Sequence, residues 1–393
     1  MPLAFTVAGT LLTTLATLYA LAALLCRPRT WTRAGASAGA SAGARPDLAR
    51  QPVTVLKPLC GFEARLEANL DTLCRQTHPH YQIVFGVRAA DDPAIAVVRR
   101  LQARYPAVDT ELVVDPRVHG GNLKVSNLIN MMAAARHPWL VLADSDIAVD
   151  ADYLERVSAP LADPQAGIVT CLYRGIPEGG LWSRVGALFI DTWFAPSVAV
   201  ASRGGSSEFG FGATIALRLD ALRAIGGFEV LKDRLADDFW LGELTRRQGL
   251  RTVLSDVVVG TDVTEQSLEA LWRRERRWMQ TIRSLNGPGY AFCFVTFTLP
   301  MLVLGLLLAP VWWNALVAAL GLAARVLLQR RAAPGIGLLL APLRDSLLLL
   351  EWLSGFAGAT TRWREHRLAV DRRSESHSTP KPIPQPDRIT QKT

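Results

Sequence analysis

The stretch Trp139-Leu140-Val141-Leu142-Ala143-Asp144-Ser145-Asp146 decides the fold. Its first five residues are apolar, which predicts a short strand. Two carboxylates, those of Asp144 and Asp146, follow at the carboxyl end of that strand. Ligands of open parallel sheets gather at the carboxyl ends of the strands, so we expect the chemistry of this chain there.

On both sides of this stretch, short apolar runs alternate with helical patterns from Pro52 to Ser284. The alternation is typical of βαβ units and predicts a mixed α/β domain with a largely parallel sheet. The expected strands are Val53–Leu56, Gln82–Val87, Thr110–Val114, Trp139–Ala143 and Gly167–Leu172. The expected helices are Phe62–Arg75, Pro93–Tyr105, Leu123–Ala135 and Phe239–Gln248.

The 393-residue chain is 50% hydrophobic, and its apolar residues gather at the N-terminus and after Gly287, as in a membrane protein with a soluble insert. Leu3–Leu25 is uncharged and long enough to span a bilayer as a helix. A cleaved signal peptide is the alternative, but its basic segment would precede the apolar run. Here Arg27, Arg29 and Arg33 follow the run, which places the next part of the chain in the cytoplasm.

Apolar stretches return after Pro288, at Tyr290–Leu308, Val311–Leu328 and Ile336–Ala357. The last contains Arg344, Asp345 and Glu351. Because charges are costly at mid-membrane, this stretch either spans against other protein segments or lies partly in the interface. Leu181–Ala201 mixes aromatic and charged residues, and is either a core helix or an interfacial element.

The net charge of +8 fits nucleic acid, an anionic membrane surface or an anionic substrate. No nucleic-acid-binding motif is present, and the arginines cluster beside apolar segments, which favours the membrane surface. The five cysteines are odd in number and lack metal-ligand spacing, so free thiols in a reduced compartment are expected.

The pair Asp144 and Asp146 can approach one divalent cation together. Mg²⁺ and Mn²⁺ take oxygen ligands and bridge to substrate phosphates, so a metal here would neutralise a diphosphate leaving group. The alternative is a solvated turn or a helix cap.

Two further acidic positions allow similar alternatives. Asp92, at a strand end, either caps the helix that Pro93 opens or accepts from a nucleobase or a ribose hydroxyl. Asp237 and Asp238, at a helix start, are either caps or include a general base that deprotonates an attacking hydroxyl in an inverting transfer.

Basic residues supply candidate phosphate ligands. Arg274 and Arg277 lie three apart and share a helix face, so they can bind phosphate oxygens or meet lipid headgroups. Lys124 follows Gly120-Gly121-Asn122-Leu123 at a helix start, which suits an anion or is an ordinary glycine turn.

Taken in order, Asp92, Asp144-Ser145-Asp146, Asp237-Asp238 and Arg274-x-x-Arg277-Trp278 resemble the D, DxD, D, (Q/R)xxRW signature of family 2-type processive and lipid glycosyltransferases with the GT-A fold. The segments Leu56–Gly61 and Asp91–Ala94 are similar to ceramide glucosyltransferases. Within that family the chain most resembles the bacterial hopanoid-associated branch, over Val113–Arg117, Lys124–Asn130, Leu172–Gly175 and Phe211–Arg218.

The resemblance implies a role for each residue. Asp92 would hold the uridine of a UDP-sugar, with Lys57 and Pro58 near the base. Asp144 and Asp146 would serve the diphosphate and the metal. Asp238 would be the base, with Asp237 as second choice, and Arg274, Arg277 and Trp278 would close over the diphosphate and the acceptor. Eukaryotic ceramide enzymes resemble DSG at the second acidic site, whereas this chain has Asp146.

The expected protein is a multi-pass enzyme of the bacterial inner membrane with a cytoplasmic GT-A domain, a Rossmann-like nucleotide-sugar domain. The expected divisions are an anchor (1–26), a flexible linker (27–51), the catalytic domain (52–287), membrane or re-entrant segments (288–360) and a polar tail (361–393). The expected reaction is inverting transfer of N-acetylglucosamine from UDP to a hopanoid such as bacteriohopanetetrol. Alternatives are a ceramide or diacylglycerol glucosyltransferase using UDP-glucose, and a non-catalytic membrane scaffold.

Overall fold

The computed structural model describes residues 2–26, 51–333, 337–357, 360–363 and 366–369. Nearly all of the predicted linker, and the predicted tail after residue 369, lie outside the described residues.

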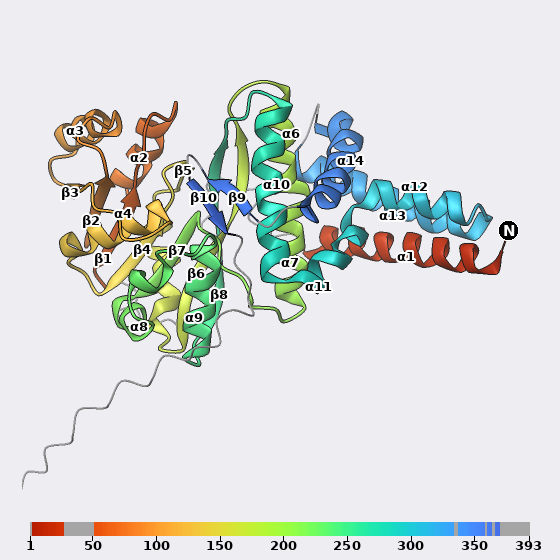
Figure 1. The fold of residues 1–393 in the computed structure, drawn as a ribbon, viewed down its shortest axis with the longest axis horizontal. Coiled ribbons are helices and arrows are strands. Elements are labelled where there is room, and N and C mark those ends of the chain that lie inside the picture. Colours follow the sequence, from red (N-terminus) through yellow and green to blue (C-terminus); the bar gives the residue numbers. More distant parts are fainter. Residues whose placement is uncertain (1, 27–50, 334–336, 358–359, 364–365, 370–393) are drawn as a thin grey trace, which may run out of the picture.

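One eight-stranded sheet forms the centre of the described chain, in the order β3-β2-β1-β4-β7-β6-β8-β5 (Figure 1). The strands are β1 (Val53–Pro58), β2 (Tyr81–Val87), β3 (Asp109–Val114), β4 (Trp139–Ala143), β5 (Ile147–Ala148), β6 (Ala166–Pro177), β7 (Thr214–Arg218) and β8 (Arg251–Val263). The first four are mutually parallel, β7 is antiparallel to both β4 and β6, and β6 is parallel to β8. The predicted mixed, mostly parallel sheet is therefore confirmed.

Helices cover both faces of this sheet because alternate strand residues point to opposite sides. In β4, Val141 packs in one apolar cluster and Leu140 in the other. The first cluster includes α2 (Leu66–Cys74), α3 (Ala94–Arg104) and α5 (Tyr153–Ser158). The second includes α4 (Leu123–Met131), α8 (Leu219–Ala224) and α9 (Asp237–Arg247). Both faces of the sheet are buried, so the candidate functional residues lie at the carboxyl ends of its strands.

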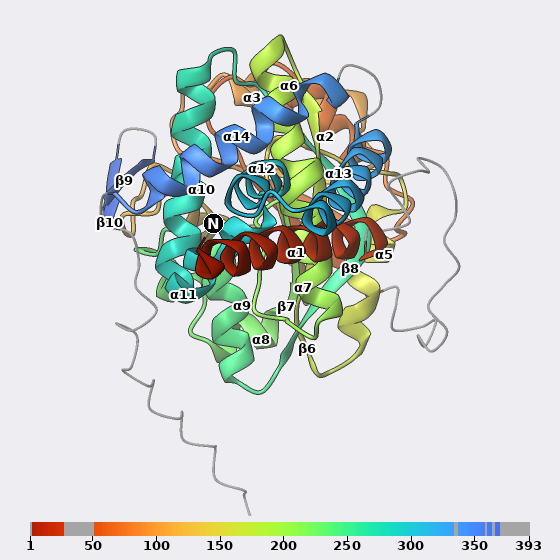
Figure 2. The same ribbon diagram turned by 90° about the vertical axis from the view of Figure 1, so that its right-hand side faces the viewer.

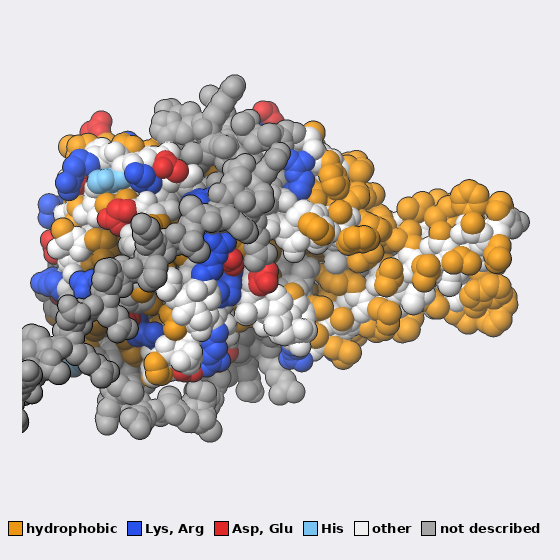
Figure 3. Space-filling model, turned by 60° about the horizontal axis from the view of Figure 1, so that its bottom comes forward, with side chains coloured by type: hydrophobic (Ala, Val, Ile, Leu, Met, Phe, Trp, Pro, Cys, Tyr) orange, Lys and Arg blue, Asp and Glu red, His pale blue; other side chains and the backbone are white. Residues whose placement is uncertain are grey.

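Long apolar helices extend from one side of the sheet domain (Figures 1 and 2). Within the described residues three are long and apolar enough to cross a membrane: α1 (Leu3–Cys26), the helix Leu181–Arg203, and α13 (Trp312–Ala332). Figure 3 shows the protruding end covered by hydrophobic side chains, with charged ones concentrated on the sheet domain. Leu11 of α1 and Leu316 of α13 are among the exposed leucines there.

Close packing of small residues joins α1 to two helices that follow the sheet domain in the sequence. A Cβ on Gly305 of α12 (Thr298–Leu308) would lie 2.1 Å from Thr13 Oγ1. A Cβ on Gly321 of α13 would lie 2.4 Å from Thr17 Oγ1. Because no larger residue fits at either position, these glycines set the approach of the three helices, as small residues do between membrane helices.

The stretch predicted as one apolar unit, Tyr290–Leu308, is broken. It folds as α11 (Gly287–Phe292), a 3₁₀ turn (Cys293–Thr296) and α12, with a bend of 75° between the two halves. Pro300 lies in the first turn of α12, where its missing N–H costs nothing, so it favours a new helix over continuation of the old one. The Trp193 indole N–H donates to Thr296 Oγ1 at 2.7 Å and holds the break.

Two ion-pair groups bury charges among the C-terminal helices. Arg325 of α13 donates to Asp345 of α14 (Gly337–Gly355) at 2.6 and 3.1 Å. Arg344 of α14 lies between two carboxylates: its Nη1 is 2.7 Å from Glu275 Oε2, and its Nη2 is 2.6 Å from Glu351 Oε2. The side chains of Arg344, Glu275 and Glu351 are fully buried, so their charges face other parts of the protein.

We expect Arg344→Met to lower the melting temperature of the detergent-solubilised protein strongly, because it leaves two buried carboxylates without their cation. Breaking a buried ion pair by removing one partner costs about 3–5 kcal/mol. Arg136→Met is the matched control, since the Arg136–Asp109 pair is exposed and such pairs contribute little. Equal melting temperatures for the two variants, measured by differential scanning fluorimetry, would contradict the prediction.

Candidate functional site

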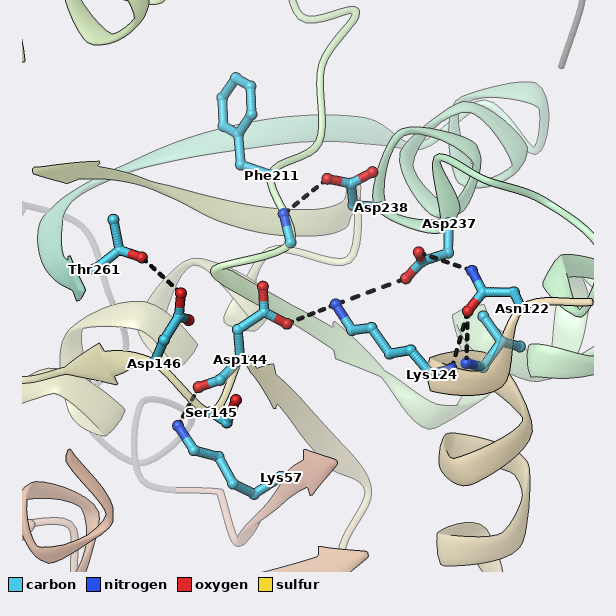
Figure 4. Close-up of polar contacts among 12 residues, drawn as sticks. Lys57, Asn122, Lys124, Asp144, Ser145, Asp146, Phe211, Asp237, Asp238 and Thr261 are labelled. Carbon is cyan, nitrogen blue, oxygen red and sulfur yellow. Dashed lines mark hydrogen bonds and ion pairs between the residues drawn. The ribbon is translucent and has the colours of Figure 1, made fainter. Parts of the chain in front are cut away.

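The candidate site lies where the carboxyl ends of β1 and β4 meet the loop before β7 and the starts of α4 and α9. Figure 4 shows Lys57, Lys124, Asp144, Asp146, Asp237 and Asp238 converging there. The structure thus brings together the second and third acidic positions of the sequence signature with both lysines.

Lys124 bridges two of the acidic segments. Its Nζ is 2.6 Å from Asp144 Oδ1 and 3.8 Å from Asp237 Oδ2. Burial lowers the pKa of Lys124, but the carboxylates of Asp144 and Asp237 more than offset this, so the net pKa is raised and the ammonium stays charged. The cation holds the end of β4 beside the start of α9.

Asn122 fixes both Lys124 and Asp237. Its Oδ1 caps α4 by accepting from the N–H groups of Lys124 at 3.0 Å and Val125 at 3.1 Å. Its Nδ2 donates to Asp237 Oδ1 at 3.1 Å and to the Arg234 carbonyl at 2.8 Å. Asn122 was not predicted as a site residue, although an asparagine before the apolar run of α4 is an ordinary capping signal.

Asp238 presents its carboxylate to the centre of the site. Its Oδ2 accepts from the Gly212 N–H at 2.9 Å, and its Oδ1 accepts from the Phe239 N–H at 2.8 Å. Burial, and next the neighbouring Asp237 carboxylate, raise the pKa of Asp238 to about 6. A carboxylate with this pKa is ionised at neutral pH and more basic than an exposed aspartate, as a general base requires.

Gly212 leaves open the space between the charged groups. A Cβ at this position would lie 3.3 Å from Asp238 Oδ2, 3.4 Å from Lys124 Nζ and 3.5 Å from Asp144 Oδ2. The glycine therefore marks the point to which the proposed base, the lysine and the first metal-binding candidate are all adjacent.

Asp144 and Asp146 have the chemistry of a hard-cation site. Asp146 Oδ2 accepts from Thr261 Oγ1 at 3.0 Å, and Lys57 Nζ donates to the Asp144 carbonyl oxygen. Burial, and then the carboxylates of Asp144 and Glu63, raise the pKa of Asp146 to about 7. No group of three or more Asp, Glu, His or Cys side chains within the described ranges could hold a metal. Two carboxylates with substrate phosphates suffice for Mg²⁺.

Lys57 and Asp92 both form hydrogen bonds with other residues of the sheet domain. Burial lowers the pKa of Lys57 to about 8, although Asp146 and Asp144 oppose the shift. Asp92 accepts from the Gly61 N–H at 2.9 Å and from the Ala94 N–H at 2.9 Å, so it holds the loop after β1 and caps α3. The Ala94 contact supports the capping alternative for Asp92, although Pro93 is the residue directly before α3. The contact of Asp92 with a uridine, like that of Lys57 and Pro58 with a base, stays a prediction.

Arg274 lies on α10 (Leu268–Leu285), whose first turn is capped by Ser267. Its Nη1 is 2.7 Å from Glu265 Oε2, and its guanidinium carbon is 5.1 Å from the centre of the Trp278 ring. Its Nη2 is 3.8 Å from Glu275 Oε1, an ion pair too long for a hydrogen bond, and its Nε has no hydrogen-bond acceptor among the described residues. Arg277 is on the same helix, and its role stays a prediction.

Tyr173, near the end of β6, is a further residue of the site that sequence reasoning did not assign. Burial raises the pKa of its phenol, and the Asp238 carboxylate is the next largest cause, whereas Arg274 opposes the shift. The phenol therefore lies in the field of both groups. Tyr173 falls in the segment Leu172–Gly175 that carries the family resemblance, but its placement in the site depends on the pairing of β6 with β7 and β8.

Comparison with known proteins gives the family. The model of "Glycosyl transferase family 21" matches residues 10–375. Ceramide glucosyltransferase 1 of Caenorhabditis elegans is 23% identical over 236 residues, which are 60% of this chain and 50% of that protein. The ceramide glucosyltransferase of Komagataella phaffii is 31% identical over 108 residues, 26% of this chain and 21% of that protein. The chain thus spans about half the length, or less, of these curated relatives.

Among solved structures, a mannosyltransferase from Pyrobaculum calidifontis, determined with GDP-Man and Mn²⁺, has a TM-score of 0.49 and 20% identity. The match covers 88% of this chain and 99% of the mannosyltransferase chain. Because the family model matches most of the sequence, this chain belongs to glycosyl transferase family 21, and together with the mixed, mostly parallel sheet this confirms the predicted GT-A-type fold.

Proposed function

We propose that the chain transfers a sugar, with inversion, from a UDP-sugar to a hydroxyl group of a membrane lipid. The placement of Asp238 carries the proposal: a carboxylate with a raised pKa lies beside the space at Gly212 that Lys124 and Asp144 also border. This is the arrangement that a base opposite a diphosphate leaving group requires.

In the proposed reaction Asp238 takes the proton of the acceptor hydroxyl. The acceptor oxygen then attacks the anomeric carbon of the sugar, and the bond from that carbon to the diphosphate oxygen breaks. UDP leaves with the bonding electrons. Lys124, Arg274 and Arg277 stabilise the charge that develops on the diphosphate, and Trp278 closes the site. Asp237 holds Lys124 in place and stands as the second candidate for the base.

The donor is held by the remaining signature residues. Asp92 binds the uridine, and Lys57 and Pro58 lie near its base. The oxygen donors of Asp144 and Asp146 fit a divalent cation, Mg²⁺ or Mn²⁺, which when bound supplies positive charge to the diphosphate.

Two features support a lipid acceptor. Three candidate membrane helices accompany the sheet domain, and the curated relatives are named ceramide glucosyltransferases. We place the segments 1–26 and 288–360 in the bacterial inner membrane, with the catalytic domain (52–287) in the cytoplasm. The first candidate substrates are a hopanoid polyol and UDP-N-acetylglucosamine, on the resemblance of Lys124–Asn130 and Phe211–Arg218 to that branch. A ceramide or diacylglycerol with UDP-glucose is the second, and the named relatives favour it.

Lipid extracts separate these candidates. Cells that carry the gene should contain a glycolipid that cells without the gene lack, and mass spectrometry identifies its sugar by mass and its lipid by fragmentation. Expression of the Asp238→Asn variant in the deleted strain is the control for loss of the protein alone. Identical lipid extracts with and without the gene would contradict a lipid acceptor.

We expect Asp238→Asn to reduce kcat by about 10²–10⁴-fold, because the amide cannot accept the proton of the acceptor hydroxyl. Binding of the UDP-sugar should change little, since Asp238 does not face the nucleotide in the proposed reaction. Asp220→Asn, on an exposed side chain, is the matched control. Transfer of radiolabelled sugar to lipid measures the effect, and near-wild-type turnover would exclude Asp238 as the base.

The rate should rise with pH through about 6 and level off above it, because Asp238 acts only when it is ionised and its folded pKa is about 6. The neighbouring Asp237 carboxylate contributes to this raised pKa. Asp237→Asn should therefore lower the pKa of Asp238 and move the acidic limb of the kcat profile to lower pH. A limb that moves to higher pH, or one that survives in Asp238→Asn, would contradict the assignment.

A further inference from the structure

Four aromatic side chains form a continuous row beside the proposed base. The ring centres of Tyr173 and Phe194 are 4.9 Å apart, those of Phe194 and Phe211 are 5.2 Å apart, and those of Phe211 and Phe209 are 5.4 Å apart. These four residues are called the aromatic row. Their contacts alternate between stacked and edge-on geometries, so one apolar surface extends over residues from three segments of the chain.

The aromatic row differs from the neighbouring core in its exposure. All four of its side chains are only partly buried. In contrast, Phe189 and Phe297 of the adjacent core cluster are completely buried. The row therefore presents apolar surface that the described part of the chain leaves partly uncovered.

Phe211 and Tyr173, whose ring centres are 6.5 Å apart, are the members of the aromatic row beside the proposed reaction centre. Phe211 directly precedes Gly212, whose N–H donates to Asp238 Oδ2 at 2.9 Å (Figure 4). The Tyr173 phenol is close enough to Asp238 and Arg274 for both to influence its pKa. Within the described part of the chain its hydroxyl has no hydrogen-bond partner, so it can donate to a bound molecule or accept from one.

Phe194 of the aromatic row belongs to a candidate membrane helix. Phe194 closes a π-helical turn (Ile190–Phe194) between α6 (Leu181–Phe189) and α7 (Ala195–Arg203). Together these form the apolar helix Leu181–Arg203, and 61% of its most apolar 18-residue stretch is buried. π-Helical turns inside longer helices are frequent at functional sites.

Two hydrogen bonds fix this helix to its surroundings. Asp191 of the π-helical turn accepts from the Gly175 N–H on β6 at 2.9 Å, two residues after Tyr173. Ser197 of α7 is 2.7 Å from the Tyr19 hydroxyl of α1. The aromatic row is thus built at a junction between the sheet and the apolar helices, and it leads from those helices to Asp238.

We propose that the aromatic row binds the apolar body of the lipid acceptor and that the Tyr173 hydroxyl hydrogen-bonds the acceptor headgroup, so that the reacting hydroxyl faces Asp238. This inference rests on the proposed function. The ligand is a lipid whose apolar part, a ring system or an acyl chain, continues into a hydroxylated head. Aromatic surface suits the first part, and Tyr173 with Asp238 suits the second. A donor sugar stacked on the same rings is the competing occupant.

The test is a two-substrate kinetic analysis of the full-length protein in mixed micelles, with bacteriohopanetetrol and a short-chain ceramide as acceptor probes. Phe194→Ala should raise KM for the lipid by about tenfold or more, because it removes a large apolar contact. Tyr173→Phe should lower kcat/KM for the lipid by about tenfold through the lost hydrogen bond. In both variants KM for the UDP-sugar and the slow hydrolysis of that donor by water should stay within about twofold of wild type, a difference of under ~0.5 kcal/mol.

Controls separate binding from folding. Trp312→Ala removes an aromatic side chain that is 73% exposed on α13, and should change neither KM. Phe194→Leu, which keeps apolar bulk, should recover much of the lipid affinity. Melting temperatures show whether each variant is folded.

The outcomes distinguish this inference from the proposed function. Folded Phe194→Ala and Tyr173→Phe proteins with unchanged lipid kinetics would overturn the inference while leaving lipid transfer intact. A raised KM for the UDP-sugar instead would assign the aromatic row to the donor. Wild-type protein that hydrolyses UDP-sugar but glycosylates neither lipid, nor any lipid of a total membrane extract, would contradict the proposed function itself.

Discussion

The buried contact between Arg344 and the two carboxylates of Glu275 and Glu351 constrains the rest of this structure. A guanidinium and two carboxylates can leave water only if each finds its partner, because isolated buried charges are prohibitively costly. Arg344 and Glu351 lie on α14, whereas Glu275 lies on α10, the helix that carries the signature arginines. The packing of α14 therefore fixes α10, and with it the position of Arg274 relative to the sheet.

Glu275 of α10 lies between two arginines. One of its oxygens is 2.7 Å from Arg344, and the other is 3.8 Å from Arg274 Nη2. Arg274 also pairs with Glu265 and stacks on Trp278. Across the site Lys124 is held by Asp144 and by the Asn122 cap of α4. In the proposed reaction, Lys124 and Arg274 bind the diphosphate from these two elements. A diphosphate bound between them would be neutralised by groups whose own positions are already set, which is how preorganised sites stabilise developing charge.

The sequence allows the sheet to be predicted where its strands are short apolar runs. β4 was predicted with its exact bounds, and β1, β2 and β3 to within two residues, because apolar residues in sequence suffice for a buried parallel strand. β7 and β8 were missed. β8 has polar residues such as Ser255 and Asp256 within it, so its apolar pattern is interrupted, and its place depends on pairing with β6. The bend at Phe297 was also missed, because an apolar stretch of sequence indicates how long a segment is but not where the chain changes direction.

The site was predictable in part for the same reason. Asp144, Asp237 and Asp238 stand at element ends, where position in the sequence determines position in the fold, and the structure gathers them around Lys124. Residues whose contacts lie far apart in the sequence were not predicted. Glu275 and Arg344 are 69 positions apart. The position of Tyr173 depends on the order of the strands in the sheet. Charged residues in an apolar stretch indicate that a buried partner exists, but they do not indicate which residue it is.

The glycine and threonine contacts between α1 and the pair α12 and α13 join helices that lie on either side of the sheet domain in the sequence. The whole sheet domain separates Thr17 from Gly305, so it is synthesised before α12 and α13 emerge from the ribosome. Thr13 and Thr17 of α1 therefore meet their glycine partners only after all strands of the sheet have been made. Packing of these three helices is thus a late step in the assembly of the described chain.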